Sequence, residues 1–387
     1  MTRAQQIAFF KSVDTPFYFY DLQKLRTVLD ALDREINQYK YHIHYALKAN
    51  ANPVILKEMV KRGYGADCVS GGEVQASLDA GFIPDQVVFA GVGKSDAEIN
   101  LALNNNISCF NAESLQELEV INELAAQKNK IAKIALRLNP DVDAKTHRYI
   151  TTGLNENKFG INPGDLPQVI ELLNTAKNLE FHGLHFHIGS QITDLSAFKH
   201  LCLKVNEFNN YFKEHQLYPK TINVGGGLGI DYHNPEEKLI PDFINFFRIF
   251  DRFLELDPNQ EVHFEPGRSL VANCGELITR VLYIKPGLSK SFAVVDAGMN
   301  ELIRPALYEA FHKIDNLSNP QNHDKKYDVV GPVCETSDTF GKDVPLPETR
   351  RGDLITIQSA GAYGEVMAGN YNLRGIVKTY HSDEINN

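Results

Sequence analysis

Residues 41–90 read YHIHYALKAN ANPVILKEMV KRGYGADCVS GGEVQASLDA GFIPDQVVFA, and this stretch decides the fold. Its short runs of β-branched and aromatic residues predict strands at 41–46, 65–69 and 86–90. The segments between them have the apolar spacing of amphipathic helices, at 52–62 and 72–81. Strands that alternate with helices pair in parallel through helical crossovers, so the stretch predicts an α/β fold with a parallel sheet.

The same alternation continues on both sides of this stretch. Further strands are expected at 107–111, 131–138, 181–187, 220–225 and 261–265. Further helices are expected at 21–38, 95–104, 113–127, 165–177, 196–215 and 240–255. Eight strand–helix units over about 240 residues have the length of a (β/α)8 barrel. We therefore predict such a barrel at residues 25–270.

The pattern changes after about residue 266. Short strand-like runs separated by turn residues replace the helical segments, for example ELITRVLYIK at 276–285 and DLITIQS at 353–359. This texture predicts a mainly antiparallel β domain at 271–387. The aromatic run TPFYFY at 15–20 precedes the first barrel helix and is predicted to be a strand of the same domain, which would then include residues 1–24.

One connection in the barrel is longer than the others. The polar stretch at 140–163 separates two predicted strands, and such loops in compact domains are commonly functional. We expect it to be a lid over the mouth of the barrel.

Composition excludes several classes of protein. The formal net charge of −10 argues against nucleic-acid binding, which normally needs a basic face. No apolar run approaches the roughly 20 residues that cross a membrane, and the first residues show no secretory signal. The five cysteines are scattered and form no CxxC pair, which indicates a reduced, cytoplasmic protein.

Residues with possible chemistry follow the predicted strands, where barrel enzymes hold their active sites. Lys48 lies among small and apolar neighbours, and desolvation of its amine would favour the neutral nucleophile that forms a Schiff base. Alone, it could also be a lysine whose stem packs on apolar surface while its amine reaches water.

The later strands add three features. The glycine turn at 225–229 could present backbone N–H groups to a phosphate or be a plain tight turn. Glu265 could be a structural carboxylate or hold a pyridine nitrogen protonated, and His187 could be a core residue or stack on a flat ring. Together with Lys48, these features describe a site for pyridoxal 5′-phosphate (PLP).

A metal-dependent hydrolase is the competing barrel enzyme. The pairs His42-x-His44 and His185-x-His187 each place two imidazoles on one strand face. However, His42 and His44 come early in their strand, below the catalytic rim, and the last strand ends in EPGR rather than in an aspartate that could act as a base. We therefore expect no metal ligands in the active site.

Several motifs now carry a resemblance to a known family. They are YALKAN at 45–50, GADCVSGGE at 65–73, HFHIGSQI at 185–192, GGGLGI at 225–230, EPGRSL at 265–270, MNELIRPALY at 299–308 and CETSD at 334–338. In this order the chain resembles the fold-III, alanine-racemase-type PLP-dependent decarboxylases over about residues 17–375. The likeness is strongest to the members that act on meso-diaminopimelate. The one small departure is Thr336, where the family usually has serine, and a hydroxyl is retained.

The resemblance implies a PLP-binding barrel followed by a β domain, and it implies a role for each matched residue. Lys48 would hold PLP covalently. Cys334 and the adjacent Glu335 would come from the other subunit of a homodimer, and Cys334 would donate a proton. Further cofactor contacts would come from Asp67, His187, Ser190, Gly226, Gly227, Glu265, Gly267, Arg268 and Tyr363. The substrate, a small amino acid, would be bound by Arg268, Arg304, Tyr308, Glu335 and Tyr363.

Substrate choice follows from the charges of this set. Arginine binds a carboxylate in a planar two-bond geometry, and glutamate pairs with an ammonium group. A distal end with both groups is that of meso-2,6-diaminopimelate, so we expect a carboxy-lyase that forms L-lysine and CO2. A polyamine-pathway decarboxylase for ornithine or carboxynorspermidine is the alternative. A PLP-binding regulator without activity is less consistent with the sequence, because every role in the site is filled.

Overall fold

Eight parallel strands close into a barrel in the computed structural model of the chain, which describes residues 2–142, 158–321 and 324–385. In chain order the strands are β2 (His42–Ala46), β3 (Gly65–Cys68), β4 (Val87–Phe89), β5 (Cys109–Ala112), β6 (Ala132–Arg137), β7 (Leu179–His185), β8 (Thr221–Asn223) and β9 (Glu261–Phe264). Each strand pairs with the next, and β9 pairs with β2 to close the ring. The predicted (β/α)8 barrel is confirmed.

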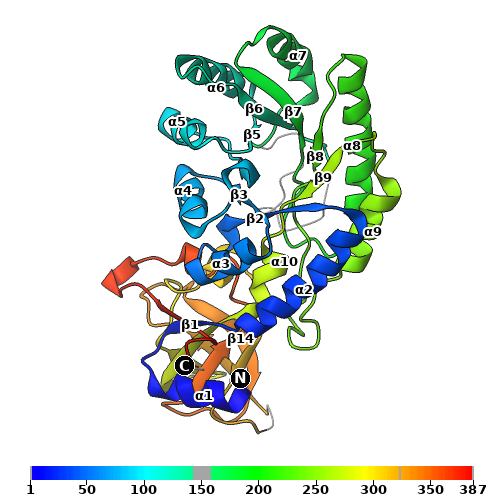
Figure 1. Ribbon diagram of the computed structural model, residues 1–387. Coiled ribbons are helices and arrows are strands. Elements are labelled where there is room, and N and C mark those ends of the chain that lie inside the picture. The colour runs from blue at the N-terminus through cyan, green and yellow to red at the C-terminus, as the bar shows by residue number, and fades with distance from the viewer. Residues whose placement is uncertain (1, 143–157, 322–323, 386–387) are drawn as a thin grey trace. The chain divides into compact units, whose positions relative to one another are not determined.

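Helices lie on the outside of these strands (Figure 1). They are α2 (Leu22–Tyr39), α3 (Pro53–Lys61), α4 (Gly71–Ala80), α5 (Asp96–Asn105), α6 (Leu115–Gln127), α7 (Leu166–Thr175), α8 (Ser196–Glu214) and α9 (Phe243–Phe253). Short 3₁₀ turns lie at η1 (Leu47–Ala49), η2 (Pro84–Gln86) and η3 (Pro163–Asp165). No helix in the described parts of the chain is long and apolar enough to cross a membrane.

Serine caps start three of these helices close behind their strands. Ser70, Ser95 and Ser114 each accept a hydrogen bond from the backbone N–H three residues further on. Such caps satisfy N–H groups that the first turn of a helix leaves unpaired. The βα loops are therefore short, and the residues in them are held close to the carboxyl rim of the barrel.

Aromatic packing covers the last strand of the barrel. The ring of Phe264 on β9 lies 4.9 Å from the rings of both Phe247 and Phe250 on α9. All three side chains are buried. Burial of this size contributes roughly 1.5–3 kcal/mol for each side chain, so α9 fixes the strand that ends beside Glu265.

The chain divides into two compact units. The barrel unit comprises residues 31–229 and 242–267, and the sheet unit comprises residues 1–30, 230–241 and 268–387. The segment 230–241, which lies inside the range predicted for the barrel, thus belongs to the sheet unit.

The described residues of the sheet unit form eight strands. They are β1 (Phe17–Tyr20), β10 (Gly275–Pro286), β11 (Ser291–Val295), β12 (Ile314–Asn316), β13 (Lys325–Val330), β14 (Thr339–Leu346), β15 (Leu354–Ile357) and β16 (Lys378–His381). The path runs β12-β15-β10-β11-β13-β14, and β1 joins it through β10. Two pairings, β1 with β16 and β11 with β13, are parallel, and the others are antiparallel. The aromatic run before the barrel therefore joins this sheet, as predicted.

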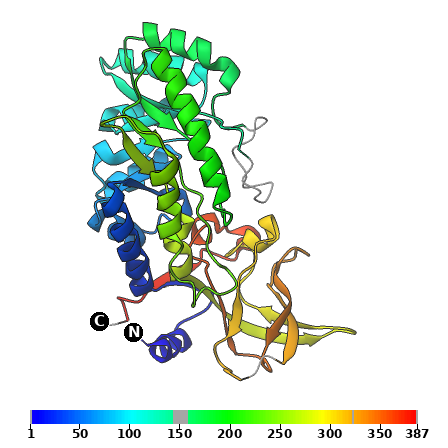
Figure 2. The ribbon, with the colours of Figure 1, turned by 90° about the vertical axis from the view of Figure 1, so that its right-hand side faces the viewer.

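Short helices complete the sheet unit, and β10 and β11 form a hairpin that projects from it (Figure 2). The helices are α1 (Arg3–Ser12), α10 (Arg268–Val271) and α11 (Arg304–Tyr308), with the 3₁₀ turns η4 (Ala272–Cys274), η5 (Glu365–Met367) and η6 (Tyr371–Leu373).

The predicted lid at 140–163 falls largely on residues 143–157, which lie outside the described residues. Where the chain is described again, Ile161 pairs with Leu138 at the end of β6.

Candidate active site

Lys48 and Asp67 form an ion pair at the carboxyl rim of the barrel. Lys48 lies in the turn after β2, Asp67 lies on β3, and Lys48 Nζ is 3.0 Å from Asp67 Oδ2. Asp67 is fully buried, and its second oxygen, Oδ1, has no hydrogen-bond partner among the described residues. Burial raises the pKa of Asp67, as does the charge of Glu265, whereas the lysine ammonium opposes both.

Glu265 follows β9 and is surrounded by hydrogen-bond donors from three other strands. His185 Nε2 lies 3.0 Å from Oε2, and Asn223 Nδ2 and Asn111 Nδ2 donate to Oε1 over 2.8 and 3.5 Å. Burial works to raise the pKa of Glu265, but His185 and the charge of Lys48 outweigh it, and the net pKa lies below its ordinary value. The carboxylate is therefore ionised inside the barrel.

His187 lies in the loop after β7 with its protonation fixed by the glycine turn. The backbone N–H of Gly226 donates to His187 Nδ1 over 3.3 Å, so the proton of the uncharged ring is on Nε2. Burial, together with the charges of Lys48 and Arg137, holds the pKa of His187 well below its ordinary value. An uncharged ring of this kind can stack on a flat cofactor.

The glycine turn requires glycine because backbones meet there. A Cβ on Gly226 would lie 2.1 Å from the carbonyl oxygen of Glu265, and one on Gly227 would lie 2.7 Å from that of Gly189. Gly227 also has a φ of +109°, which side chains other than hydrogen rarely allow. The neighbouring loop pairs with this turn through Ile192 N–H and Gly227 O at 2.9 Å, which places Ser190 in the loop that borders the turn.

Gly267 fixes the turn that carries Lys48. A Cβ at this position would lie 2.8 Å from Ala49 Cβ and 3.2 Å from Ala46 Cβ. The backbone N–H of Ala46 donates to the carbonyl of Pro266 over 3.2 Å. The loop after β9 and the turn after β2 thus hold each other at one part of the rim.

These residues fit PLP by their chemistry. The lysine amine can bond to an aldehyde carbon, and an ionised, buried carboxylate can keep a ring nitrogen protonated. Backbone N–H groups in a turn without side chains suit a phosphate. The unpartnered Oδ1 of Asp67 leaves a buried acceptor, which needs a donor from outside the described residues.

The sheet unit holds a separate buried group of cations and aromatic rings. Arg268 Nη1 donates to the Tyr232 hydroxyl over 2.6 Å, and Arg304 Nη1 donates to His312 Nε2 over 2.8 Å. The Arg304 guanidinium also lies 5.1 Å from the centre of the Tyr232 ring. Both arginines are about 5% exposed (Arg268 6%, Arg304 5%). We call these four residues the arginine group.

Arg304 has no carboxylate partner among the ion pairs of the described residues. Burial and the charge of Arg268 lower its pKa, and burial with the charge of Arg304 lowers the pKa of His312 to about 3. His312 is therefore uncharged and accepts the bond from Arg304, while its Nδ1–H donates to the carbonyl of Gln358 over 2.8 Å. Because no carboxylate of the described residues pairs with Arg304, its guanidinium is suited to an anion from outside them.

Tyr363 and Tyr308 are placed around Arg268 and Arg304. The Arg268 guanidinium lies 4.9 Å from the centre of the Tyr363 ring. Tyr363 has a φ of +55°, an uncommon conformation for a bulky residue that is often found at functional positions. Tyr308 is half-buried at the last position of α11, the helix that begins with Arg304.

Cys334 and Glu335 lie in the loop between β13 and β14. The thiol is exposed, and Glu335 accepts a hydrogen bond from Tyr371 over 2.7 Å. Asp338 shapes the loop, because its buried carboxylate accepts bonds from the backbone N–H groups of Val333 and Met299, both over 2.7 Å. Within the described residues no hydrogen bond or ion pair joins Cys334 or Glu335 to the arginine group.

Sequence reasoning missed the residues that support this site. Asn111 and Asn223 bind Glu265, and Tyr232 and His312 hold the arginines. Arg137, at the end of β6, pairs with the buried carboxylate of Glu113 over 2.9 Å. A polar residue within an apolar strand was the available signal for Asn111, Asn223 and Arg137.

Comparison with known proteins agrees with this geometry. Residues 22–272 match the family model for the pyridoxal-binding domain of pyridoxal-dependent decarboxylases. A diaminopimelate decarboxylase of Bacteroides thetaiotaomicron is 54% identical over 97% of each chain. The chain belongs to the diaminopimelate decarboxylase family.

Solved structures support the same assignment. Diaminopimelate decarboxylase from Helicobacter pylori, crystallised with L-lysine, is 41% identical and superposes with a TM-score of 0.90 over 98% of this chain and 94% of that one. A lysine/ornithine decarboxylase from Vibrio vulnificus, at 22% identity and a TM-score of 0.85 over 98% and 97% of the chains, shares the fold alone. The predicted family is therefore confirmed. The predicted PLP cofactor is confirmed as well, because it is the cofactor of this family.

Proposed function

We propose that the chain catalyses the α-decarboxylation of meso-2,6-diaminopimelate to L-lysine and CO2, with PLP at the carboxyl rim of the barrel. The observation that carries the proposal is one lysine with two buried carboxylates, Lys48 with Asp67 and Glu265, in a chain 54% identical to a named diaminopimelate decarboxylase. The H. pylori relative was crystallised with the product that we propose.

Lys48 and Glu265 take the two roles closest to the chemistry. PLP, when bound, accepts the electron pair that remains at Cα after CO2 departs. We assign its attachment to Lys48 Nζ, and we assign the ring nitrogen's partner to Glu265. Three N–H donors keep the Glu265 carboxylate ionised, so it can hold a proton on that nitrogen without taking it up.

The remaining predicted cofactor residues position the ring and the phosphate. The uncharged His187 would stack on the ring, and the N–H of Gly227, with Ser190, would face the phosphate. Gly226, whose own N–H bonds to His187, would border the phosphate without a side chain. Gly267 acts through packing, since it fixes the turn that carries Lys48.

Recognition of the substrate is assigned to the arginine group. The guanidinium of Arg304 is buried and pairs with no carboxylate in the described parts of the chain, which favours a substrate with a distal carboxylate over a diamine precursor such as ornithine. We assign the distal carboxylate to Arg304 and Arg268, with Tyr308 and Tyr363 beside them and Glu335 of the partner subunit on the distal ammonium.

A proton must reach Cα after CO2 leaves. We assign it to the thiol of Cys334 of the partner subunit, in a homodimer whose two active sites each take residues from both chains. The thiol of Cys334 is free and exposed, so it is accessible as a proton donor. The thiol must stay reduced for this role, which fits our proposal of a cytoplasmic location.

A CO2-release assay tests the proposal. The purified protein, loaded with PLP, is given meso-diaminopimelate, ornithine, arginine and carboxynorspermidine at equal concentrations. We expect the highest kcat/KM with meso-diaminopimelate, and L-lysine as its product. A higher kcat/KM with ornithine or carboxynorspermidine would assign the chain to the polyamine enzymes, and release from none of the four would contradict a decarboxylase.

A further inference from the structure

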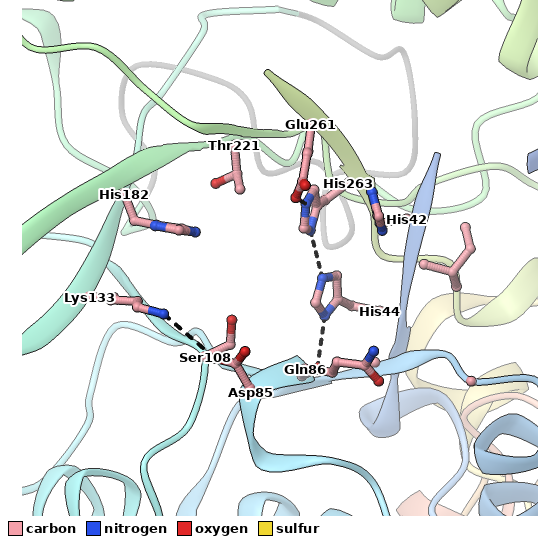
Figure 3. A pocket seen from close by; sticks show the side chains of 13 residues that line it. His42, His44, Asp85, Gln86, Ser108, Lys133, His182, Thr221, Glu261 and His263 are labelled. Carbon is pink, nitrogen blue, oxygen red and sulfur yellow. Dashed lines mark hydrogen bonds and ion pairs between the residues drawn. The ribbon is translucent and has the colours of Figure 1, made fainter. Parts of the chain in front are cut away.

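A polar cavity opens at the amino ends of the barrel strands, the opposite end from Lys48 and Glu265. It has a volume of about 340 Å³, and four histidines line it, namely His42, His44, His182 and His263 (Figure 3). Nδ1 of His182 is buried and has no hydrogen-bond partner among the described residues. The reaction proposed above uses none of these side chains.

Two neighbouring strands bring three metal-binding groups together in this cavity. His42 on β2 lies opposite His263 on β9, and Glu261 precedes His263 by two residues on the same face of β9. One ligand atom from each of the three side chains lies within 4.8 Å of the other two. Figure 3 shows Glu261 against the His263 ring, with His42 beside them.

A chain of hydrogen bonds determines which nitrogen of His263 is bare. His44 Nδ1 lies 3.1 Å from the carbonyl oxygen of Gln86, which can only accept, so this nitrogen carries a proton. In the tautomer in which the one proton of the His44 ring is on Nδ1, His44 Nε2 accepts from His263 Nδ1–H over 2.7 Å. The lone pair of His263 is then on Nε2.

This lone pair faces a carboxylate. His263 Nε2 lies 3.4 Å from Glu261 Oε2, so two acceptors meet with no proton of their own between them. A cation bound between these two acceptor atoms would replace their repulsion with attraction. Two ligand atoms at 2.0–2.1 Å from a tetrahedral Zn²⁺ are about 3.3–3.4 Å apart, which is the separation found here.

We propose that His42, Glu261 and His263 bind one divalent transition-metal ion of the Zn²⁺ type at the amino end of the barrel. Two imidazole nitrogens and one carboxylate oxygen form the ligand set, and water completes the coordination. The nearby cation, Lys133, is 3.6 Å from Asp85, so its charge is partly compensated.

The ion would connect the first and the last strand of the barrel. β2 and β9 are joined by only two paired positions, His42 with His263 and Ile43 with Phe264. Their residues are more than 200 positions apart in the sequence. A metal that binds the closed barrel but not the open chain stabilises the closed form, and its role is therefore structural.

Zinc binding to the PLP-loaded protein tests the proposal. The protein is freed of metal with a chelator, and Zn²⁺ is titrated in competition with a chromophoric chelator. We expect one Zn²⁺ per chain, a melting temperature that rises with zinc, and affinity reduced more than about 100-fold in His42→Gln and in Glu261→Gln, because removal of a ligand exceeds the 10–100-fold effect of an outer partner. Both side chains are exposed, so the variants should fold.

Matched controls separate this site from other zinc ligands. His200→Gln changes an exposed histidine on α8 and should bind zinc as the unaltered chain does. Zinc held by the exposed thiol of Cys334 would persist in both test variants, and that result would overturn the proposal. Absence of stoichiometric zinc, as expected if a proton occupies His263 Nε2, would overturn it as well. Equal competition by Mg²⁺, which avoids imidazole, would refute the proposed ligand set.

Discussion

Replacement of Arg304 should separate substrate binding from stability. Arg304 is buried, bonds to His312 over 2.8 Å, and has no carboxylate partner among the described ion pairs. Burial, together with the charge of Arg268, lowers the pKa of Arg304. The free protein therefore gains little from this cation, whereas a bound carboxylate gains a charge-assisted pair.

The size of the effect follows from the strength of such a pair. A hydrogen bond to a charged group contributes about 1.5–3 kcal/mol, which corresponds to a fall in kcat/KM of about 10- to 150-fold for Arg304→Met. Arg304→Lys retains the charge but not the planar guanidinium, so its kcat/KM should lie between that of the unaltered chain and that of Arg304→Met. The melting temperature of Arg304→Met should stay close to that of the unaltered chain, because removal of a buried cation beside another cation offsets the loss of its bond to His312.

The assay measures CO2 release from meso-diaminopimelate, with PLP absorbance and thermal unfolding as parallel readouts. Arg350→Ala, at an exposed arginine, is the matched control and should change none of the three. Unchanged kcat/KM in Arg304→Met would refute the assignment to the substrate. A large loss of stability would show instead that Arg304 is a structural residue.

Three further predictions concern the cofactor and the shared site. Reduction with borohydride should attach PLP to the peptide that contains Lys48, as read by mass spectrometry, and attachment to another lysine would contradict the assignment. Because the pKa of Glu265 lies below its ordinary value, its contribution to stability is complete above about pH 4.5 and is lost as the pH falls towards the folded-state pKa. The stability of Glu265→Gln in urea should therefore depend less on pH in that acidic range than the stability of the unaltered chain. Identical pH profiles of the two proteins would show that the Glu265 charge does not contribute to the pH dependence. Lys48→Ala and Cys334→Ala should each be inactive, and their mixture after subunit exchange should recover about a quarter of the activity, since half the dimers are mixed and each of these has one intact site. No recovery despite proven exchange would place both residues in one chain's site.

The barrel could be predicted because its signals are local. Helix caps, apolar periodicity and short β-branched runs act over a few residues, and the observed strands lie within about two residues of the expected ones. Helix α1 could not be predicted, because RAQQIAFFKS shows little amphipathic pattern. Its support is distant in the sequence, through Phe10 packed 4.9 Å from Phe19 and Arg3 bonded to Glu276 over 2.8 Å.

The same difference between local signals and distant contacts applies to the candidate site. Lys48 and Glu265 stand directly after predicted strands, where the barrel architecture itself indicates function. Asn111 and Asn223 acquire their role only because Glu265 arrives beside them from 154 and 42 residues away in the sequence. His312 likewise matters through one bond to Arg304, and no motif marks it.

The donors around Glu265 also have a consequence for how the protein is made. They come from β5, β7 and β8, and the carboxylate comes after β9, so no partly synthesised barrel contains the complete set. A growing chain on the ribosome should be unable to retain the cofactor until residue 265 and the strand before it have emerged and joined β2. The appearance of PLP absorbance during refolding should accordingly report the moment of ring closure, later than the formation of helices.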